Sequence, residues 1–207
     1  MNQHNLIILT SILAVIAGCS GGYHLRGVST SYGYQKVEAP EPVYLGKKSQ
    51  RFEVRPGDCA RAPRPGMWDD CKGDRERVEL MSTNKHYPGS NIWISFLIYL
   101  PDYFKTSRFV NADLGQIKME SSDLEGMAGG YKSYPPLIQL NARGTDYTAC
   151  YHIINKTREG GITDYCSNKK IAEISEMRGK WNRITLHLNA KPKKPNVKVF
   201  FNIHKFS

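Results

Sequence analysis

The stretch that decides the fold is RERVELMSTNKHYPGSNIWISFLIYLPDYF, residues 75–104. In its first part, charged and apolar side chains alternate, so a strand would place Arg75, Arg77 and Glu79 on one face. After a Tyr-Pro-Gly-Ser turn, residues Ile92–Leu100 are apolar on both faces of a strand, which is typical of the centre of a layered sheet. The stretch therefore predicts a sheet with one polar, working face.

The rest of the chain repeats this alternation of short strands and turns. Further strands are predicted at Arg51–Arg55, Asp113–Met119, Leu137–Asn141, Tyr147–Ile154, Asn182–Leu188 and Val197–Ile203. Only Lys169–Arg178 has a helical character, and a Gly-rich, Ser-rich loop at Glu120–Ser133 is of the kind that covers a binding site. Seven or eight short strands with almost no helix predict an all-β fold of the sandwich or barrel type.

The amino-terminal residues have the layout of an export signal. An uncharged apolar run, Leu6–Ala17, is too short for the roughly 20 residues that span a bilayer, and small residues precede Cys19. Because Ile16–Cys19 resembles the bacterial lipobox, we expect a lipoprotein signal peptide at residues 1–18 and lipidation at Cys19. The expected location is the bacterial cell envelope, lipid-anchored at the outer membrane and facing the periplasm or the exterior. Ordinary secretion and an uncleaved anchor are the alternatives.

The remaining sequence divides into a tether and one folded domain. Residues 19–49 are rich in Gly, Ser, Tyr and Pro with little periodicity, which predicts a tether, and residues 50–207 form the domain. Four cysteines in an oxidising compartment predict two disulfides. Three connectivities are possible, and local loop closure favours Cys59 with Cys71 and Cys150 with Cys166. No pair has the close spacing of a zinc site, so no metal is expected.

The charge indicates the class of partner. The chain has 29 Lys and Arg against 19 Asp and Glu, a net charge of +10, which suits an acidic polysaccharide or an anionic surface, although a basic surface also serves solubility alone. There is no P-loop, dinucleotide fingerprint, zinc-protease motif or nucleophile elbow, so no cofactor is expected. An exported chain without a recognition module is not expected to bind nucleic acid. We expect a monomer that contacts the membrane only through its lipid anchor.

Polar side chains that converge on a sheet suit a uronic acid chain, because carboxylates bind Arg and sugar faces stack on Trp or Tyr. An ordinary solvated pair at Arg77 and Glu79 is the alternative. The candidate substrate-binding residues are Arg75, Glu79, Trp93, Asn141, Arg183 and His187.

Six short blocks in order resemble the heparin lyase I-like polysaccharide lyases, which are related to alginate and glucuronan lyases. The blocks are Arg51–Asp58, Arg77–Leu80, Ile94–Phe104, Leu114–Gln116, Pro136–Ile138 and Gly179–Trp181. The resemblance implies a β-jelly-roll sandwich of concanavalin-like type with a groove for an anionic polysaccharide.

The resemblance also implies cleavage by β-elimination. Arg77 and Gln116 would hold the uronate carboxylate, with Glu79 orienting Arg77. Relatives often carry the basic His two residues after the Gln, where this chain has Lys118, and their terminal Tyr-Phe-Lys-x-Gly-x-Tyr-like motif is absent from the sequence. The candidates left for proton transfer are Lys118, Tyr131, Tyr134, His152 and His187. The sequence therefore predicts a lyase-like protein that binds, and either cleaves or only binds, a uronate polysaccharide; a structural envelope lipoprotein is the further alternative.

Overall fold

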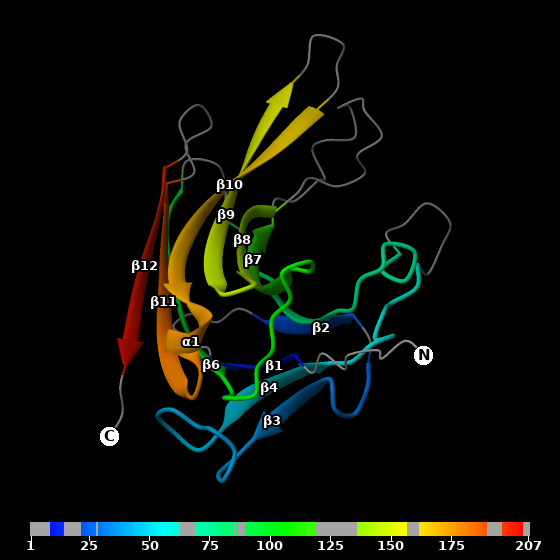
Figure 1. The fold of residues 1–207 in the computed structure, drawn as a ribbon, viewed down its shortest axis with the longest axis vertical. Coiled ribbons are helices and arrows are strands. Elements are labelled where there is room, and N and C mark those ends of the chain that lie inside the picture. The colour runs from blue at the N-terminus through cyan, green and yellow to red at the C-terminus, as the bar shows by residue number, and fades with distance from the viewer. Residues whose placement is uncertain are drawn as a thin grey trace. The chain divides into compact units, whose positions relative to one another are not determined.

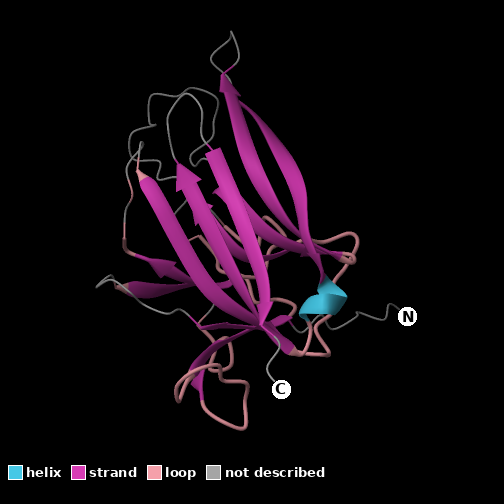
Figure 2. Ribbon diagram, turned by 90° about the vertical axis from the view of Figure 1, so that its left-hand side faces the viewer, coloured by secondary structure: helices cyan, strands magenta, loops and turns pink. Residues whose placement is uncertain are grey.

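Strands dominate the structure, a computed structural model that describes residues 9–14, 22–27, 29–62, 69–84, 86, 90–118, 136–156, 162–189 and 196–204. Within these ranges it contains twelve strands and one four-residue helix (Figure 2). The strands are β1 (Leu9–Ala14), β2 (Tyr23–Gly27), β3 (Tyr34–Val37), β4 (Ser49–Val54), β5 (Val78–Ser82), β6 (Asn91–Leu100), β7 (Ala112–Lys118), β8 (Pro136–Arg143), β9 (Asp146–Lys156), β10 (Ile162–Glu173), β11 (Lys180–Asn189) and β12 (Asn196–His204), and the helix is α1 (Ile174–Met177). None of the described helical residues belongs to a segment long and apolar enough to cross a membrane.

The chain folds as two compact units, residues 1–105 with 177–207, and residues 106–176. In the first unit, a six-stranded sheet has the order β12-β11-β6-β1-β4-β3 (Figure 1). Strand β2 pairs with β5 in a separate two-stranded sheet. The second unit contains a four-stranded sheet of order β10-β9-β8-β7. Every ladder between these strands is antiparallel, so the predicted all-β fold of β-sandwich type is confirmed.

The pair β6–β11 forms the centre of the first unit. Ten residues of each strand pair in continuous register, from Leu100 opposite Lys180 to Asn91 opposite Asn189. The inward face of this ladder carries buried aliphatic side chains, each of which contributes roughly 1.5–3 kcal/mol relative to exposure. They include Ile98, Leu100, Ile184, Leu186 and Leu188, all at most 2% exposed. The prediction that Ile92–Leu100 is a central strand is confirmed.

A glycine allows the chain to enter β11. Gly179 has a φ of +65° and donates a hydrogen bond from its amide to the carbonyl of Leu100 over 2.8 Å. A Cβ at this position would lie 2.4 Å from Oδ1 of Asp102. Only glycine tolerates both the left-handed backbone and this close approach, which gives a physical reason for the Gly-Lys-Trp block.

The sheet of the second unit has one apolar and one polar face. Ile138, Leu140 and Tyr147 are at most 1% exposed and lie on the apolar face. The opposite face carries polar side chains from β7, β8 and β9. The hairpin β9–β10 is closed by the disulfide Cys150–Cys166, and Cys59–Cys71 closes a loop in the first unit. Both predicted disulfides are therefore confirmed.

Two segments differ from the pattern expected from the sequence. The predicted helix at Lys169–Arg178 is wrong over most of its length: β10 continues to Glu173, and the helix has only residues Ile174–Met177. The predicted strand from Arg75 begins instead at Val78, because the amides of Arg75 and Arg77 donate to loop carbonyls.

Three amino-terminal strands lie in segments for which the sequence predicted no strand. β1 falls within the predicted signal peptide and pairs with β4 and β6, whereas β2 and β3 fall within the predicted tether and pair with β5 and β4. Residues Tyr23–Gly27 and Tyr34–Val37 of the predicted tether are thus paired with strands β5 and β4. Cleavage of the signal stays a prediction.

Candidate functional site

The guanidinium of Arg77 lies between two carboxylates. It forms an ion pair with Asp70 and donates to Oε1 of Glu79 over 3.2 Å. Only 20% of the Arg77 side chain and 5% of that of Asp70 are exposed. Burial acts to lower the pKa of Arg77, but the hydrogen bond to Asp70 and the charges of both carboxylates outweigh it, so the pKa of Arg77 is raised. The guanidinium therefore stays charged and is held in place.

Backbone hydrogen bonds fix this cluster at the base of a loop. The Cys59–Cys71 disulfide closes the loop that contains Asp70, whose carbonyl accepts a hydrogen bond from the amide of Arg75 over 3.0 Å. The amide of Arg77 donates to the carbonyl of Asp58 over 2.9 Å. The cluster thus joins the stapled loop to the start of β5, and the predicted orientation of Arg77 by Glu79 agrees with this geometry, although Asp70 adds a second partner that the sequence did not predict.

The outward face of the β6–β11 ladder presents an aromatic and basic strip, formed by Trp93, Ser95, Arg183, Thr185 and His187 and hereafter called the β6–β11 strip. Trp93 is 60% exposed, and its ring stacks on that of His187, with centroids 4.1 Å apart and planes 10° apart.

Neighbouring hydrogen bonds hold this strip in place. The His187 ring Nε2 lies 2.6 Å from Oδ1 of Asn91, and the hydroxyls of Ser95 and Thr185 are 3.0 Å apart. Arg183 lies on the same face, four residues from His187 and so about 13 Å along the strand. The strip combines a flat aromatic surface, hydroxyls and a cation.

Arg183 is only partly exposed, and its Nε is buried without a hydrogen-bond partner among the described residues. A buried donor without a partner costs free energy. Arg183 is the one guanidinium among the five residues of the strip.

The polar face of the second unit brings Gln116 and Asn141 together with His152. Gln116 lies opposite Gln139, which lies opposite Cys150, and His152 is two residues further along the same face of β9. Asn141 is 5% exposed, and its Oδ1 has no hydrogen-bond partner among the described residues. Gln116 is exposed and Lys118, at the end of β7, is exposed as well. This face therefore collects amide groups around one imidazole.

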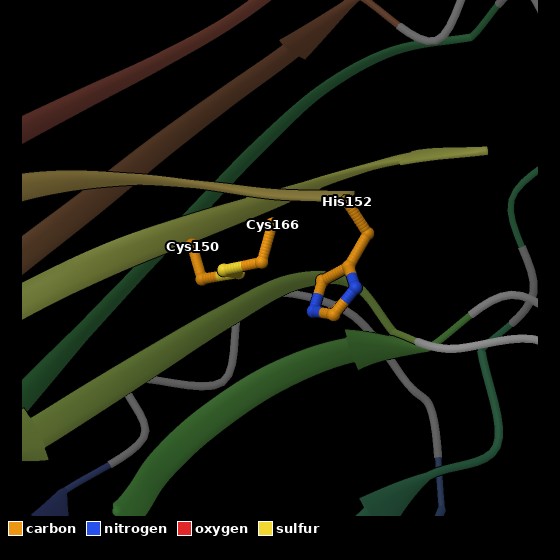
Figure 3. A group of neighbouring side chains, drawn as sticks. All are labelled: Cys150, His152 and Cys166. Atoms are coloured by element: carbon orange, nitrogen blue, oxygen red, sulfur yellow. A yellow bond between two sulfur atoms is a disulfide. The ribbon is translucent and has the colours of Figure 1, made fainter. Parts of the chain in front are cut away.

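Beside this face, Cys150, His152 and Cys166 form a compact group (Figure 3). Their possible metal-binding atoms all lie within 4.8 Å of one another. Cysteine binds metals as the thiolate, and here the two sulfur atoms are joined in a disulfide. The group is consequently a disulfide packed beside a histidine, and in this form it offers no thiolate to a metal.

The structure divides the predicted site residues among three places. Arg75, Arg77 and Glu79 lie at the start of β5, Trp93, Arg183 and His187 on the β6–β11 strip, and Gln116, Lys118 and Asn141 on β7 and β8 of the second unit. Tyr131, Tyr134 and Cys19 lie outside the described residues.

Sequence reasoning missed the hydrogen bond between His152 and Gln139 and the link through Gln139 to Asp113. The signal available was the polar side chains of Gln139 and Asn141 in an otherwise apolar strand.

Comparison with known proteins supplies the family. No curated protein and no solved structure was found to match the chain. The family model described as polysaccharide lyase matches residues 22–203, a span that includes every strand from β2 to β11 and most of β12. Because this match covers most of the sequence, the chain belongs to the polysaccharide lyase family.

Proposed function

We propose that the protein binds an acidic, uronate-containing polysaccharide and cleaves it by β-elimination, in the manner of the heparin lyase I-like branch that its sequence blocks resemble. The observation that carries the proposal is the amide-rich face around His152 in a chain of the polysaccharide lyase family. The net charge of +10 favours an anionic polymer over a neutral one.

The β6–β11 strip supports the binding part of the proposal. The exposed ring of Trp93 offers a flat apolar surface to a sugar ring, and His187 holds that ring in place by stacking. Arg183 supplies a guanidinium whose Nε lacks a partner among the described residues, and guanidinium forks bind carboxylates in a fixed geometry. Uronate polymers carry both features, sugar faces and carboxylates.

The polar face of the second unit supports the chemical part. Gln116 and Asn141 would donate amide hydrogens to the uronate carboxylate, which stabilises the negative charge that develops at C5. His152 would remove the C5 proton; the electron pair of the C5–H bond forms the C4–C5 double bond, and the bond from C4 to the leaving O4 breaks. Lys118 or Tyr134 would return a proton to O4. One proton is removed from C5 and one is returned to O4, so the elimination balances.

The sequence prediction that Arg77 neutralises a uronate carboxylate, with Glu79 orienting it, is retained as a proposal for the first unit by itself. A uronate carboxylate would have to share the guanidinium with Asp70 and Glu79, which are already bound to it. An Arg has five N–H donors, so a third acceptor is chemically allowed. Arg183 is the second guanidinium available for this purpose in the first unit.

The proposal also includes export of the protein to the cell envelope. A lipoprotein signal at residues 1–18 and acylation at Cys19 would anchor a monomeric domain to the bacterial cell envelope. There the domain would contact acidic polysaccharides. The two disulfides support an oxidising compartment.

A non-catalytic carbohydrate-binding lipoprotein is the second candidate. His152 is only 9% exposed and Arg77 is bound by two carboxylates, as in residues that serve structure. This candidate keeps the β6–β11 strip as the binding surface and needs no proton transfer.

One experiment separates the two candidates. The purified full chain is incubated with alginate, glucuronan or heparin from acid to alkaline pH, and the ultraviolet absorbance of the new C4–C5 double bond is followed. A lyase produces this absorbance, and His152→Gln lowers the rate by roughly 10²–10⁴-fold, the usual contribution of a positioned base. His24→Gln, an exposed histidine of β2, is the matched control and leaves the rate unchanged.

The negative outcomes are equally distinct. Retention on an acidic-polysaccharide column that salt weakens, without product at any pH, supports the binding protein. Absence of retention even at low salt contradicts both candidates.

A further inference from the structure

Two hydrogen bonds link side chains from three neighbouring strands of the second unit. Nε2 of Gln139, on β8, donates to Oδ2 of Asp113, on β7, over 2.8 Å. Oε1 of the same Gln139 lies 2.7 Å from Nε2 of His152, on β9. Gln139 therefore stands between a carboxylate and an imidazole, and each end of its amide is engaged by one of them.

The chemistry of these groups gives the chain of bonds a direction. An ionised carboxylate only accepts hydrogen bonds, so the amide must turn its NH₂ end toward Asp113. Its oxygen then faces His152, and an amide oxygen also only accepts. The ring nitrogen opposite it, Nε2 of His152, must therefore be the donor and must carry a proton.

The reversed amide is disfavoured by the same reasoning. It would bring Oε1 of Gln139 to 2.8 Å from a carboxylate oxygen of Asp113, with no hydrogen between two acceptors. The oriented arrangement replaces this repulsion with a charge-assisted hydrogen bond, which is roughly twice as strong as a neutral one. Asp113 thereby fixes the orientation of Gln139, and Gln139 fixes the proton on His152.

We propose that Asp113 and Gln139 are positioning residues that hold His152 in the tautomer protonated at Nε2, so that Nδ1 is the atom that accepts the substrate proton. The inference rests on the proposed function only for the identity of that proton. When the C5–H bond breaks, its proton goes to Nδ1 and its electron pair to the new double bond. The imidazolium formed keeps Nε2–H on the Gln139 oxygen, and this hydrogen bond strengthens because its donor is now charged.

The tautomer is measured directly by nuclear magnetic resonance on the full chain with ¹⁵N-labelled histidine. Long-range proton–nitrogen correlations distinguish a ring protonated at Nε2 from one protonated at Nδ1. The chain has six histidines, and the spectrum of His152→Gln identifies the signals of His152. The expected result at a pH where the ring is neutral is a single tautomer with the proton on Nε2.

Variants test the direction of the relay. Gln139→Leu removes both bonds, and Asp113→Leu, at an exposed position, removes only the anchor of the amide. Both are expected to give a mixture of tautomers at His152, whereas Asp113→Glu, which retains a carboxylate that only accepts hydrogen bonds, keeps the single tautomer. Asn91→Leu is the matched control, because it removes the amide oxygen beside His187 in the other unit and leaves the signals of His152 unchanged.

Turnover adds a second readout. Gln139→Leu is expected to lower kcat by roughly 10- to 100-fold with little change in KM, as a fraction of the ~10²–10⁴-fold that a positioned base contributes. Asp113→Glu, which retains the carboxylate, stays close to the unmodified protein.

The inference is overturned if His152 of the unmodified protein carries its neutral-state proton on Nδ1. It is also overturned if Asp113→Leu and Gln139→Leu both keep the original single tautomer. A protein that yields no unsaturated product but shows the Nε2–H tautomer contradicts the proposed lyase reaction and not the relay, so the two failures are distinguishable.

Discussion

The imidazole of His187 lies parallel to the indole of Trp93, with ring centroids 4.1 Å apart and ring planes 10° apart. The two residues are directly opposite in the β6–β11 ladder, so the stack follows from the register of two strands far apart in the sequence. One ring face of Trp93 is covered by His187, and the indole remains 60% exposed. A rigid, exposed aromatic ring is well suited to pack against the face of a sugar ring.

Replacement of this ring is expected to weaken polysaccharide binding. Trp93→Ala removes the stacking surface, and we expect the dissociation constant to rise about tenfold, equivalent to ~1.4 kcal/mol. Calorimetric titration with a uronate oligosaccharide at low salt measures the change. Tyr103→Ala is the matched control, because Tyr103 is 61% exposed and lies off the strip. Equal affinity of Trp93→Ala and the unmodified chain would exclude the strip as a binding surface.

The alternation of residues predicted most strands, but the partners of the site residues depended on register and loop path. The positions of Trp93 and His187 on outward faces follow from a period of two, whereas their pairing follows only from the ladder. Asp70, next to the Cys59–Cys71 disulfide, pairs with Arg77 seven residues later, a contact that no periodicity encodes.

The wrong helix prediction has a similar cause. The segment from Lys169 to Glu173 pairs with β9 residues, including Ala149 and Asp146, and these ladder bonds outweigh a weak helix propensity. Local preference decides an element only where tertiary pairing does not compete with it.

The loss of Arg77 is expected to destabilise the first unit. Arg77→Ala leaves the carboxylate of Asp70, itself 4% exposed, without its guanidinium, and breaking such a buried pair costs about 3–5 kcal/mol. Urea denaturation followed by tryptophan fluorescence measures the free energy of unfolding.

Arg26→Ala is the matched control for Arg77. Arg26 lies 3.7 Å from the shared partner Glu79 and is more exposed, so its loss is expected to cost about 1 kcal/mol or less. Similar effects of the two substitutions would show that Arg77 is an ordinary surface residue, available to substrate.

A buried hydroxyl is expected to reduce the stability of the second unit. Tyr147 is 0% exposed, its hydroxyl has no hydrogen-bond partner among the described residues, and burial raises its pKa. Tyr147→Phe removes the unsatisfied group and keeps the ring, so we expect a gain of about 1 kcal/mol or more in unfolding free energy.

Tyr32→Phe is the contrasting variant, because the Tyr32 hydroxyl donates to Oδ1 of Asp58 over 2.7 Å and its loss should destabilise the first unit. Thermal unfolding followed by circular dichroism measures both changes. A lower stability of Tyr147→Phe would indicate that its hydroxyl has a partner.

The ion pair between Asp146 and Lys170 is expected to make the β9–β10 hairpin sensitive to acid. The two side chains are 2.9 Å apart, and the hydrogen bond from Lys170 lowers the pKa of Asp146 below its usual value near 4. A carboxyl whose pKa is lower in the folded state contributes stability above its unfolded pKa, and this contribution is lost as the pH falls through the folded pKa. Protection of β9 and β10 amides from hydrogen exchange should therefore decline as the pH falls from about 5 to below 3.

Asp146→Asn removes the titrating group, so the hairpin of this variant should be less protected at pH 7 but should lose less protection on acidification. Because the pair is exposed to solvent, high salt should reduce the difference between the variant and the unmodified chain. Glu41→Gln, which removes one exposed carboxylate of the first unit, is the control and should leave the acid response of the hairpin unchanged. An acid response of Asp146→Asn as steep as that of the unmodified chain would assign the sensitivity to another group, since the pairing with Lys170 would then be too weak to shift the proton equilibrium.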